Sequence, residues 1–284
     1  MLRQFRLNLD STDQLDMKTK SSFHLKKWYF DCTTEDGRVL ICYAALLHWR
    51  AFKVGYVSYI YVDGAGERHH MSKLKSVLEP EIEEKTIRWH DSGLDLSGEW
   101  HSAAPPIRTR LHDTDEGYLD WHCIQPAAQC IIHLGNEPTL SGWGYVECLE
   151  MTLPPWKMDF NELRWGRFVQ ANTPLVWIEL RGELNRFWVF DGQASIPVAS
   201  ISDEAIVLPE SHKKLLLSEP FVLEDTNKIK ETVDLLIRWM PEIDRFTPLH
   251  FLSAQETKWR SKGTLLVNNQ VENTGWVIHE LVKF

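Results

Sequence analysis

The sequence lacks the features that mark proteins of nucleic-acid and membrane surfaces. Its 31 Lys and Arg residues are outnumbered by 40 Asp and Glu residues, which leaves a formal net charge of −9, and no basic stripe runs along any segment. A protein that follows a phosphate backbone or an anionic lipid surface needs such a stripe, so neither partner is expected. The longest apolar run, 39–47, is far too short for an integral membrane span. The first residues also lack the apolar segment of a secretion signal.

Cysteine pairs and cofactor motifs are equally sparse. The five cysteines are odd in number and show no C-x-x-C spacing, which disfavours structural disulfides and a zinc knuckle. We therefore expect buried, inert thiols in a reducing compartment, and a cytoplasmic protein. The twelve histidines show no H-E-x-x-H spacing, and the chain has neither a Gly-rich phosphate loop nor a G-x-S-x-G turn. We predict no metal site and no cofactor.

Aromatic residues are abundant instead, with 13 Trp residues spread from Trp28 to Trp276. Most of the chain consists of short runs of aromatic and β-branched residues separated by Gly, Asp-Gly and Pro, which predicts an all-β protein. Glu35-Asp36-Gly37, for example, stands between two such runs, 28–32 and 38–43, as a hairpin turn would.

A weak internal repeat predicts two β units. Strand, turn, strand, aromatic strand and Asp-Gly recur in the same order, first over 28–64 and again over 165–192. Many short strands at regular spacing favour barrels or sandwiches. Pro154-Pro155 would begin the linker, because neither proline can sit in a central strand. The expected domains are therefore 1–155 and 156–284.

One helix is predicted, at 227–240 in the second unit. Apolar residues recur there at helical spacing, and Pro241 follows directly. We expect this helix to pack on a barrel, because that is the usual role of an amphipathic helix.

The central part of the chain carries a more distinctive pattern. Its segments are 142–147 (Gly-Trp-Gly-Tyr-Val-Glu), 153–156 (Leu-Pro-Pro-Trp) and 163–168 (Leu-Arg-Trp-Gly-Arg-Phe). The pattern resembles the carotenoid 1,2-hydratase (hydroxyneurosporene synthase) and AttH-like family, as do the opening 28–31 and the closing 275–280. The resemblance implies two tandem calycin- or lipocalin-like β-barrel domains. It also implies cofactor-free chemistry, since activities in the wider group are water addition to isoprenoid double bonds and cyclisations, including Diels–Alder ring closure.

The same resemblance indicates candidate catalytic residues. The hydratases imply a Tyr-x-Asp pair, and Tyr145-Val146-Glu147 stands in its place with Glu for Asp. They also imply a His-x-Trp pair about one hairpin earlier, for which Asp120-Trp121-His122 is the nearest counterpart, in a different order. The candidate catalytic residues are Glu147, Tyr145, His122 and Asp120.

Strand geometry supports a role for this pair without reference to any family. Residues i and i+2 of a strand face the same side, so Tyr145 should point with Glu147, and Asp120 with His122. Desolvation inside an apolar barrel would raise the Glu147 pKa and keep the acid neutral, ready to protonate an alkene or a carbonyl. Nearby Trp and Tyr faces would stabilise a developing cation. The alternative is a Glu147 that pairs with Arg164 or Arg167, or that faces solvent.

Large side chains around the pair are expected to bind an apolar substrate. The candidate substrate-binding residues are Trp121, Trp143, Trp28, Tyr43, Trp165, Trp177 and Arg167. For any single Trp, core packing is the plainer interpretation. Arg167 could hold a polar head, although we favour an inter-domain salt bridge with close strand packing at Gly166. Asp31 either points inward or begins the turn before Gly37, and the turn is favoured.

Three functions fit these observations. The first is a cofactor-independent enzyme that hydrates, isomerises or cyclises a hydrophobic, isoprenoid or polyketide-like substrate, with Tyr145 and His122 as hydrogen-bonding partners of Glu147. The second is a non-catalytic carrier or sensor of an apolar small molecule in the same pocket. The third is an interaction module that binds protein between its barrels. Substrate identity and oligomeric state do not follow from the sequence.

Overall fold

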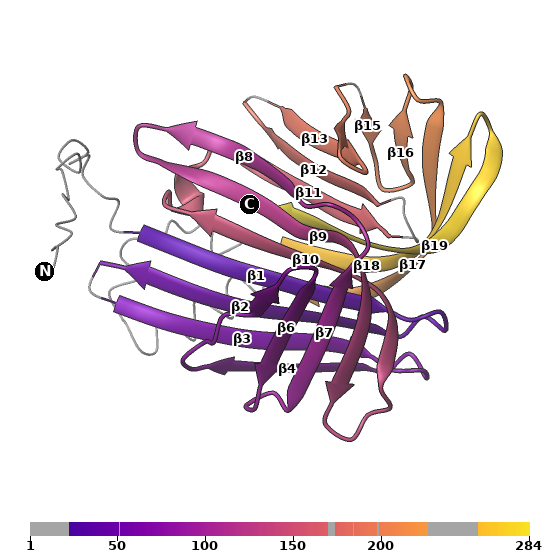
Figure 1. Ribbon diagram of the computed structural model, residues 1–284. Helices are drawn as coiled ribbons and strands as arrows, with labels where there is room; N and C mark the ends of the chain where they lie inside the picture. The colour runs from indigo at the N-terminus through magenta and orange to yellow at the C-terminus, as the bar shows by residue number, and fades with distance from the viewer. Residues whose placement is uncertain (1–22, 51, 170–173, 184, 198, 227–254) are drawn as a thin grey trace, which may run out of the picture.

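The computed structural model describes residues 23–50, 52–169, 174–183, 185–197, 199–226 and 255–284. These residues form two large antiparallel sheets, which Figure 1 shows as two curved layers, the first starting in indigo and the second ending in yellow. The predicted all-β class is confirmed. Within the described ranges, no helix is long and apolar enough to cross a membrane. The helix expected at 227–240 lies outside the described residues.

The first sheet is built from the N-terminal half of the chain. Its strands are β1 (Phe23–Thr33), β2 (Val39–Trp49), β3 (Phe52–Val62), β4 (Arg68–Leu74), β5 (Glu81–Glu83), β6 (Thr86–Asp91), β7 (Leu96–Ser102), β8 (Ile107–Thr114), β9 (Gly117–Leu134) and β10 (Leu140–Met151). Neighbouring strands follow the order β4-β3-β2-β1-β10-β9-β7-β6-β5, and β8 pairs with β9. The last strand thus returns beside the first.

The second sheet repeats this arrangement. After a short 3-10 turn, η1 (Pro155–Lys157), its strands are β11 (Phe160–Phe168), β12 (Leu175–Gly182), β13 (Arg186–Asp191), β14 (Ala194–Ser195), β15 (Ser200–Ile201), β16 (Ala205–Leu208), β17 (Lys213–Thr226), β18 (Gln255–Val267) and β19 (Gln270–Lys283). Their order, β14-β13-β12-β11-β19-β18-β17-β16-β15, has the same topology as the first sheet. The sequence repeat coincides with β1–β3 and β11–β13. The division into domains 1–155 and 156–284 stays a prediction, and it falls in the connection between the two sheets.

Alternate residues of the central strands are buried on opposite faces, which produces three apolar layers. The first inner layer is formed by the first sheet alone, with Trp28, Phe30, Cys42, Trp89, Trp100 and Val146 among its members. The second inner layer is formed by the second sheet alone, with Phe168, Trp177, Val189 and Val277. The middle layer joins both sheets through Tyr29, Ile41, Trp121, Tyr145, Trp165, Ile178, Phe190 and Ile278.

Two packing expectations hold in these layers. A Cβ atom at Gly166 would lie 2.1 Å from the Trp177 ring, so the glycine permits the close strand packing that was anticipated. All five cysteines are free and buried, as expected.

Candidate active site

The strands that border the middle layer bring the polar residues of the central segment together. The pairing of β1 with β10 places Tyr29 opposite Glu147 and Asp31 opposite Tyr145. On β11, Trp165 and Arg167 alternate with Gly166, which packs on the second inner layer, so both side chains face the middle layer. Side chains of both sheets therefore meet around one buried set of polar groups.

Glu147 accepts hydrogen bonds from aromatic residues of both sheets. Trp121 Nε1 and Tyr145 OH each donate to Glu147 Oε2 at 2.5 Å, and Trp165 Nε1 donates to the same oxygen at 3.3 Å. No hydrogen bond reaches Oε1 from the residues that the structure describes. Tyr145 and Glu147 point together, as the strand periodicity predicts, and Glu147 pairs with neither Arg164 nor Arg167.

Burial controls the acidity of this carboxyl group. The half-buried Glu147 has a pKa raised from its ordinary 4.5, chiefly because desolvation disfavours the carboxylate, and the negative charge of Glu280 adds to the rise. The hydrogen bonds from Tyr145 and Trp121 and the positive charge of Lys27 oppose the rise without cancelling it. The neutral acid is therefore favoured more than at an ordinary glutamate.

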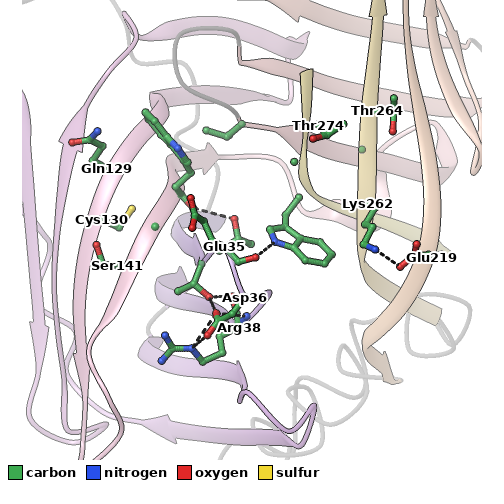
Figure 2. Close-up of a pocket in the computed structure, with 18 of the residues that line it drawn as sticks. Glu35, Asp36, Arg38, Gln129, Cys130, Ser141, Glu219, Lys262, Thr264 and Thr274 are labelled. Atoms are coloured by element: carbon green, nitrogen blue, oxygen red, sulfur yellow. Dashed lines mark hydrogen bonds and ion pairs between the residues drawn. The ribbon is translucent and has the colours of Figure 1, made fainter. Parts of the chain in front are cut away.

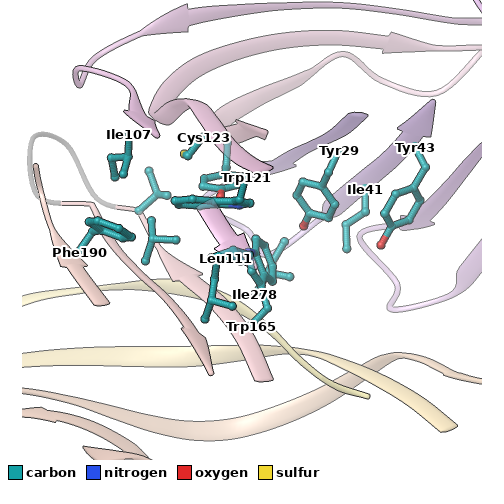
Figure 3. Packing of buried hydrophobic residues seen from close by; sticks show 14 of the residues in the cluster. Tyr29, Ile41, Tyr43, Ile107, Leu111, Trp121, Cys123, Trp165, Phe190 and Ile278 are labelled. Atoms are coloured by element: carbon teal, nitrogen blue, oxygen red, sulfur yellow. The ribbon is translucent and has the colours of Figure 1, made fainter. Parts of the chain in front are cut away.

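Aromatic rings enclose the carboxyl group. The Tyr29 ring packs edge-on against Trp165, with centroids 5.1 Å apart, and Tyr145 contacts the same indole at 5.5 Å. Trp121 stacks on Phe190 of the second sheet at 5.6 Å. Figure 3 shows these rings converging from several strands, with Tyr29 beside Tyr43 and Trp121 beside Phe190. The faces of electron-rich rings are suited to stabilise positive charge.

A buried ion pair joins the two sheets beside this site. Arg167 donates from Nε to Asp31 Oδ2 at 2.9 Å and from a terminal nitrogen to Oδ1 at 2.7 Å, and both side chains are fully buried. Tyr29 OH donates to Asp31 Oδ2 at 2.9 Å. Burial raises the pKa of Asp31, and the Arg167 charge opposes that rise. The salt bridge favoured for Arg167 is present, and it joins the two sheets. The preferred interpretation of Asp31 as a turn residue is wrong, because its side chain points inward and pairs with the guanidinium.

A second buried cation was missed by the sequence reasoning. Lys258 on β18 is fully buried and donates to Glu256 at 2.7 Å and to Tyr43 OH, across the middle layer, at 2.6 Å. It also pairs with Glu280 at 2.7 Å. The neighbouring carboxylates hold the pKa of Lys258 well above its usual range, although burial alone would lower it. The sequence signal for this ion pair is the i, i+2 spacing of Glu256 and Lys258, which places both side chains on one face of a strand.

Asp120 and His122 do not approach Glu147. Because Trp121 faces the middle layer, its two chain neighbours face the other side of β9. There Arg110 binds Asp120 at 2.7 and 2.9 Å, and Arg108 Nε donates to His122 Nε2 at 2.9 Å. The expectation that His122 hydrogen-bonds Glu147 is wrong for this reason. Asp120 and His122 do share a face, as expected, but it is the opposite one.

The candidate substrate-binding residues fall into different layers. Tyr43, Trp121, Trp165 and Arg167 border the middle layer, as described above. Trp28 belongs to the first inner layer and Trp177 to the second, and each packs there against its own sheet. Neither of these two side chains therefore borders Glu147.

Trp143 lines a cleft of about 1330 Å³ between the sheets. One wall of this cleft comes from the turn after β1, with Glu35, Asp36 and Arg38, and the opposite wall from β17–β19. Figure 2 shows Lys262 and Glu219 on that opposite wall. Trp276 on β19 donates its indole N–H to the Glu35 carbonyl at 3.3 Å and so links the two walls. Trp143 lies on the same face of β10 as Tyr145 and Glu147, so this face runs from the cleft toward the acid.

Metal-binding geometry occurs once in the described part of the chain. Asp63 and Glu67, in the turn between β3 and β4, and His69, near the start of β4, offer ligand atoms within 4.8 Å of one another. The Asp63 carboxylate already accepts the backbone N–H groups of Ala65 and Glu67, at 2.9 and 2.8 Å. The Asp63 carboxylate thus stabilises the turn, and the cluster does not border Glu147.

Comparison with known proteins identifies the fold. An AttH-like protein from Nitrosomonas europaea has a similar structure, with a TM-score of 0.50 and 12% sequence identity over 91% of this chain and 92% of that chain. CghA is similar at a TM-score of 0.49 and 10% identity, over 93% and 89%. Kievitone hydratase from Nectria haematococca is similar at 0.44 and 10%, over 93% and 90%. No family sequence model matches the chain, and neither does any curated protein sequence.

At such low identity, the similarity to the Nitrosomonas protein shows the fold alone. The chain has the AttH-like, lipocalin-like fold, which confirms the expectation drawn from 142–168. The chemistry has to be argued from the side chains of the middle layer.

Proposed function

We propose that this protein is a cofactor-independent enzyme that acts on a hydrophobic, isoprenoid or polyketide-like substrate by acid-assisted hydration, isomerisation or cyclisation. Glu147 is the proton donor and Tyr145 its hydrogen-bonding partner. The observation that carries the proposal is the Glu147 carboxyl group, half-buried among aromatic rings with Trp121, Tyr145 and Trp165 all donating to one oxygen.

The hydrogen bonds give the two carboxyl oxygens different roles. Because Oε2 accepts from three donors, the proton of the neutral acid is carried on Oε1. Burial favours that neutral form by raising the Glu147 pKa. Once the proton has left, the same donors stabilise the carboxylate. The group is therefore suited to give a proton and to take one back.

The reaction follows from this exchange. Oε1 protonates one carbon of an alkene, and the neighbouring carbon becomes a carbocation that the faces of Trp165 and Tyr29 stabilise. In a hydration, water adds to that carbon and its extra proton returns to the Glu147 carboxylate. In an isomerisation or a cyclisation, the substrate itself loses a different proton to the same carboxylate. Each route restores the neutral acid and consumes no cofactor.

The surroundings of Glu147 favour an apolar substrate. The middle layer consists mainly of Tyr, Trp, Ile, Leu and Val side chains. Tyr43, Trp121 and Trp165 would contact the substrate within this layer, and Trp143 would contact it at the cleft. Because the Arg167 guanidinium already pairs with Asp31, its proposed contribution is to hold β11 and β1 together around the site.

The test is conversion of a panel of terpenoids and polyenes in D₂O, followed by mass spectrometry, with wild type and Glu147→Gln. Wild type should convert at least one compound and introduce deuterium at carbon. Glu147→Gln should be slower by about 10²–10⁴-fold, the usual contribution of a positioned acid. Glu150→Gln is the matched control, because Glu150 lies on the other face of β10 and pairs with His24 at 2.8 Å. Equal conversion by wild type and Glu147→Gln would rule out the proposed donor.

A non-catalytic carrier or sensor of an apolar small molecule is the second candidate. It is favoured by one observation: three cavities lined by described residues have walls that do not include Glu147. The same panel separates the two functions. A carrier would bind a compound, with quenching of tryptophan fluorescence, and release it unchanged, and Glu147→Gln would bind it equally well.

A further inference from the structure

A separate cavity of about 640 Å³ opens on the other face of the first sheet. This volume is typical of small-molecule sites. Trp28, Ile124 and Cys148 line it, and all three also pack in or against the first inner layer. Two residues further along the same strands lie Lys26 and His122. The cavity is therefore the place where the apolar inner layer of the first sheet ends in a polar rim.

Folding alone does not explain two features of this cavity. Trp28 is 5% exposed, and its indole N–H is buried with no hydrogen-bond partner among the described residues. Ile82, on the short strand β5, also lines the cavity and is 51% exposed. An unpaired buried donor and an exposed aliphatic side chain are both unfavourable in a free protein, and a partly apolar ligand would relieve both.

The basic groups of the rim differ in how they are neutralised. Lys26 pairs with Glu79, and Arg110 binds Asp120 through two hydrogen bonds. Arg108 instead donates its Nε to His122 at 2.9 Å, and no carboxylate pairs with it in the part of the chain that the structure describes. The two terminal nitrogens of Arg108 are left without a protein acceptor there.

His122 leaves the charge of Arg108 intact. Desolvation, with a smaller contribution from the Arg108 charge, lowers the pKa of His122 from 6.5 to about 4. At neutral pH the imidazole is therefore uncharged and acts only as an acceptor for Nε. It orients the guanidinium without neutralising it.

We propose that this cavity binds a small amphipathic carboxylate. The apolar body of the ligand lies between Trp28, Ile124 and Ile82, and its carboxylate accepts hydrogen bonds from the terminal nitrogens of Arg108. A planar guanidinium matches a carboxylate with two parallel hydrogen bonds, which an ammonium cannot do. The site is distinct from Glu147, and the inference does not depend on the proposed catalytic function.

The experiment uses the full chain and two probes of equal length, decanoate and its neutral analogue decanol, in isothermal titration calorimetry near pH 7. Wild type should bind decanoate. Arg108→Gln should weaken decanoate binding by about ten- to a hundredfold, the loss expected for hydrogen bonds to a charged group, and should leave decanol binding unchanged. Arg110→Gln is the matched control, because it lies on the same face of β8 but is already paired with Asp120, and it should keep most of the affinity.

Two further variants locate the ligand. Ile82→Glu places a negative charge on the exposed apolar wall and should weaken both probes, whereas Glu147→Gln should change neither. Because Arg108 and Ile82 are exposed, these variants should fold, which circular dichroism would verify. Absence of decanoate binding to wild type, or equal binding by wild type and Arg108→Gln, would overturn the proposal. Loss of binding in Glu147→Gln alone would also overturn it, because the ligand would then occupy the middle layer.

Discussion

The first inner layer and the middle layer share the same strands but differ in chemistry. Even-numbered residues of β1, such as Phe30, enter the first inner layer, where rings stack on each other, as Phe30 does on Trp89 at 5.1 Å. Odd-numbered residues of the same strand enter the middle layer, where Asp31 accepts from Arg167 of the second sheet and Tyr29 donates to Asp31. Four of the five cysteines lie in the first inner layer, and the buried pair Asp31–Arg167 lies in the middle one.

The contrast shows where function can reside in this fold. A stacked apolar layer is stabilised by burial alone, and it gains nothing from charges. Buried ions are costly, and removing one partner of a pair leaves the other uncompensated. A layer that retains Asp31, Arg167, Lys258 and Glu147 in spite of this cost is where a functional site is expected.

The largest effect expected is on stability, from breaking the buried pair. Arg167→Met should lower the free energy of unfolding by about 3–5 kcal/mol, because Asp31 would remain as an unpaired buried charge. Adding Asp31→Leu should restore much of the loss. Urea unfolding measures both, and Glu116→Gln, which breaks the exposed pair with Lys157, should cost no more than about 1 kcal/mol. Equal effects of the buried and the exposed substitution would show that the middle layer does not hold its charges as described.

An intermediate effect should arise from overpacking an inner layer. Gly166→Ala places a methyl group against the Trp177 ring and should cost about 1–3 kcal/mol in unfolding free energy. Glu147 and its donors should stay in place, because they lie in or beside the middle layer, which Gly166 does not face. Gly64→Ala is the control, since no atom lies within 4 Å of a Cβ built there, and it should be close to neutral. A Gly166→Ala protein as stable as wild type would contradict the close packing.

A smaller effect is expected from removing one hydrogen bond in the middle layer. Tyr145→Phe deletes a donor to Glu147 Oε2 and should cost about 0.5–1.5 kcal/mol in unfolding free energy. Because that hydrogen bond lowers the pKa of Glu147, its loss should raise this pKa further. Titration of the carboxyl group by ¹³C NMR would measure the change. A pKa that falls, or that stays at the wild-type value, would show that Tyr145 does not donate to the carboxylate.

Two titratable groups, His279 and Glu147, should respond to pH in opposite directions. His279 hydrogen-bonds Ser261 at 2.8 Å, and burial lowers its pKa from 6.5 to about 4, so the folded state prefers the neutral ring. Its contribution to stability is present above pH 6.5 and is lost as the pH falls toward 4. Glu147, whose folded pKa is raised, contributes stability below its ordinary value of 4.5 and loses it as the pH rises through the folded pKa.

Thermal unfolding from pH 4 to 8 would separate these contributions. Relative to wild type, His279→Asn should be less sensitive to acid, and Glu147→Gln should be relatively more stable at neutral pH than at pH 4. If both variants shifted the curve in the same direction, the opposite pKa shifts assigned to His279 and Glu147 would be contradicted.

Several features of this structure could be predicted from sequence because they depend on local pattern. The all-β class, the repeat of β1–β3 in β11–β13, the shared face of Tyr145 and Glu147 and the close packing at Gly166 all follow from strand periodicity and turn residues. The face of each strand could not be assigned in the same way. Where both faces of a strand are buried, polar and apolar residues no longer alternate regularly. The local sequence therefore did not show that Trp121, and not His122, lies on the face of β9 that meets Glu147.

Long-range partners were the second obstacle. Asp31 was interpreted as a turn residue because its neighbours 35–37 form a turn, whereas its actual partner lies 136 positions away. Lys258 reaches Tyr43 across 215 positions, and no spacing rule connects two such residues. Both contacts depend on how the second sheet lies against the first, which a single strand does not encode.

The pairing of Asp31 with Arg167 has a consequence for the modularity of this chain. Each half repeats one topology, which suggests two interchangeable building blocks, yet each contributes one member of a pair that neither can complete. A half produced alone, or fused to an unrelated half, would carry Asp31 or Arg167 without its counter-ion. Recombination between such proteins would therefore yield a stable fold only when both residues of the pair are present. The ion pair thus limits which halves can be combined.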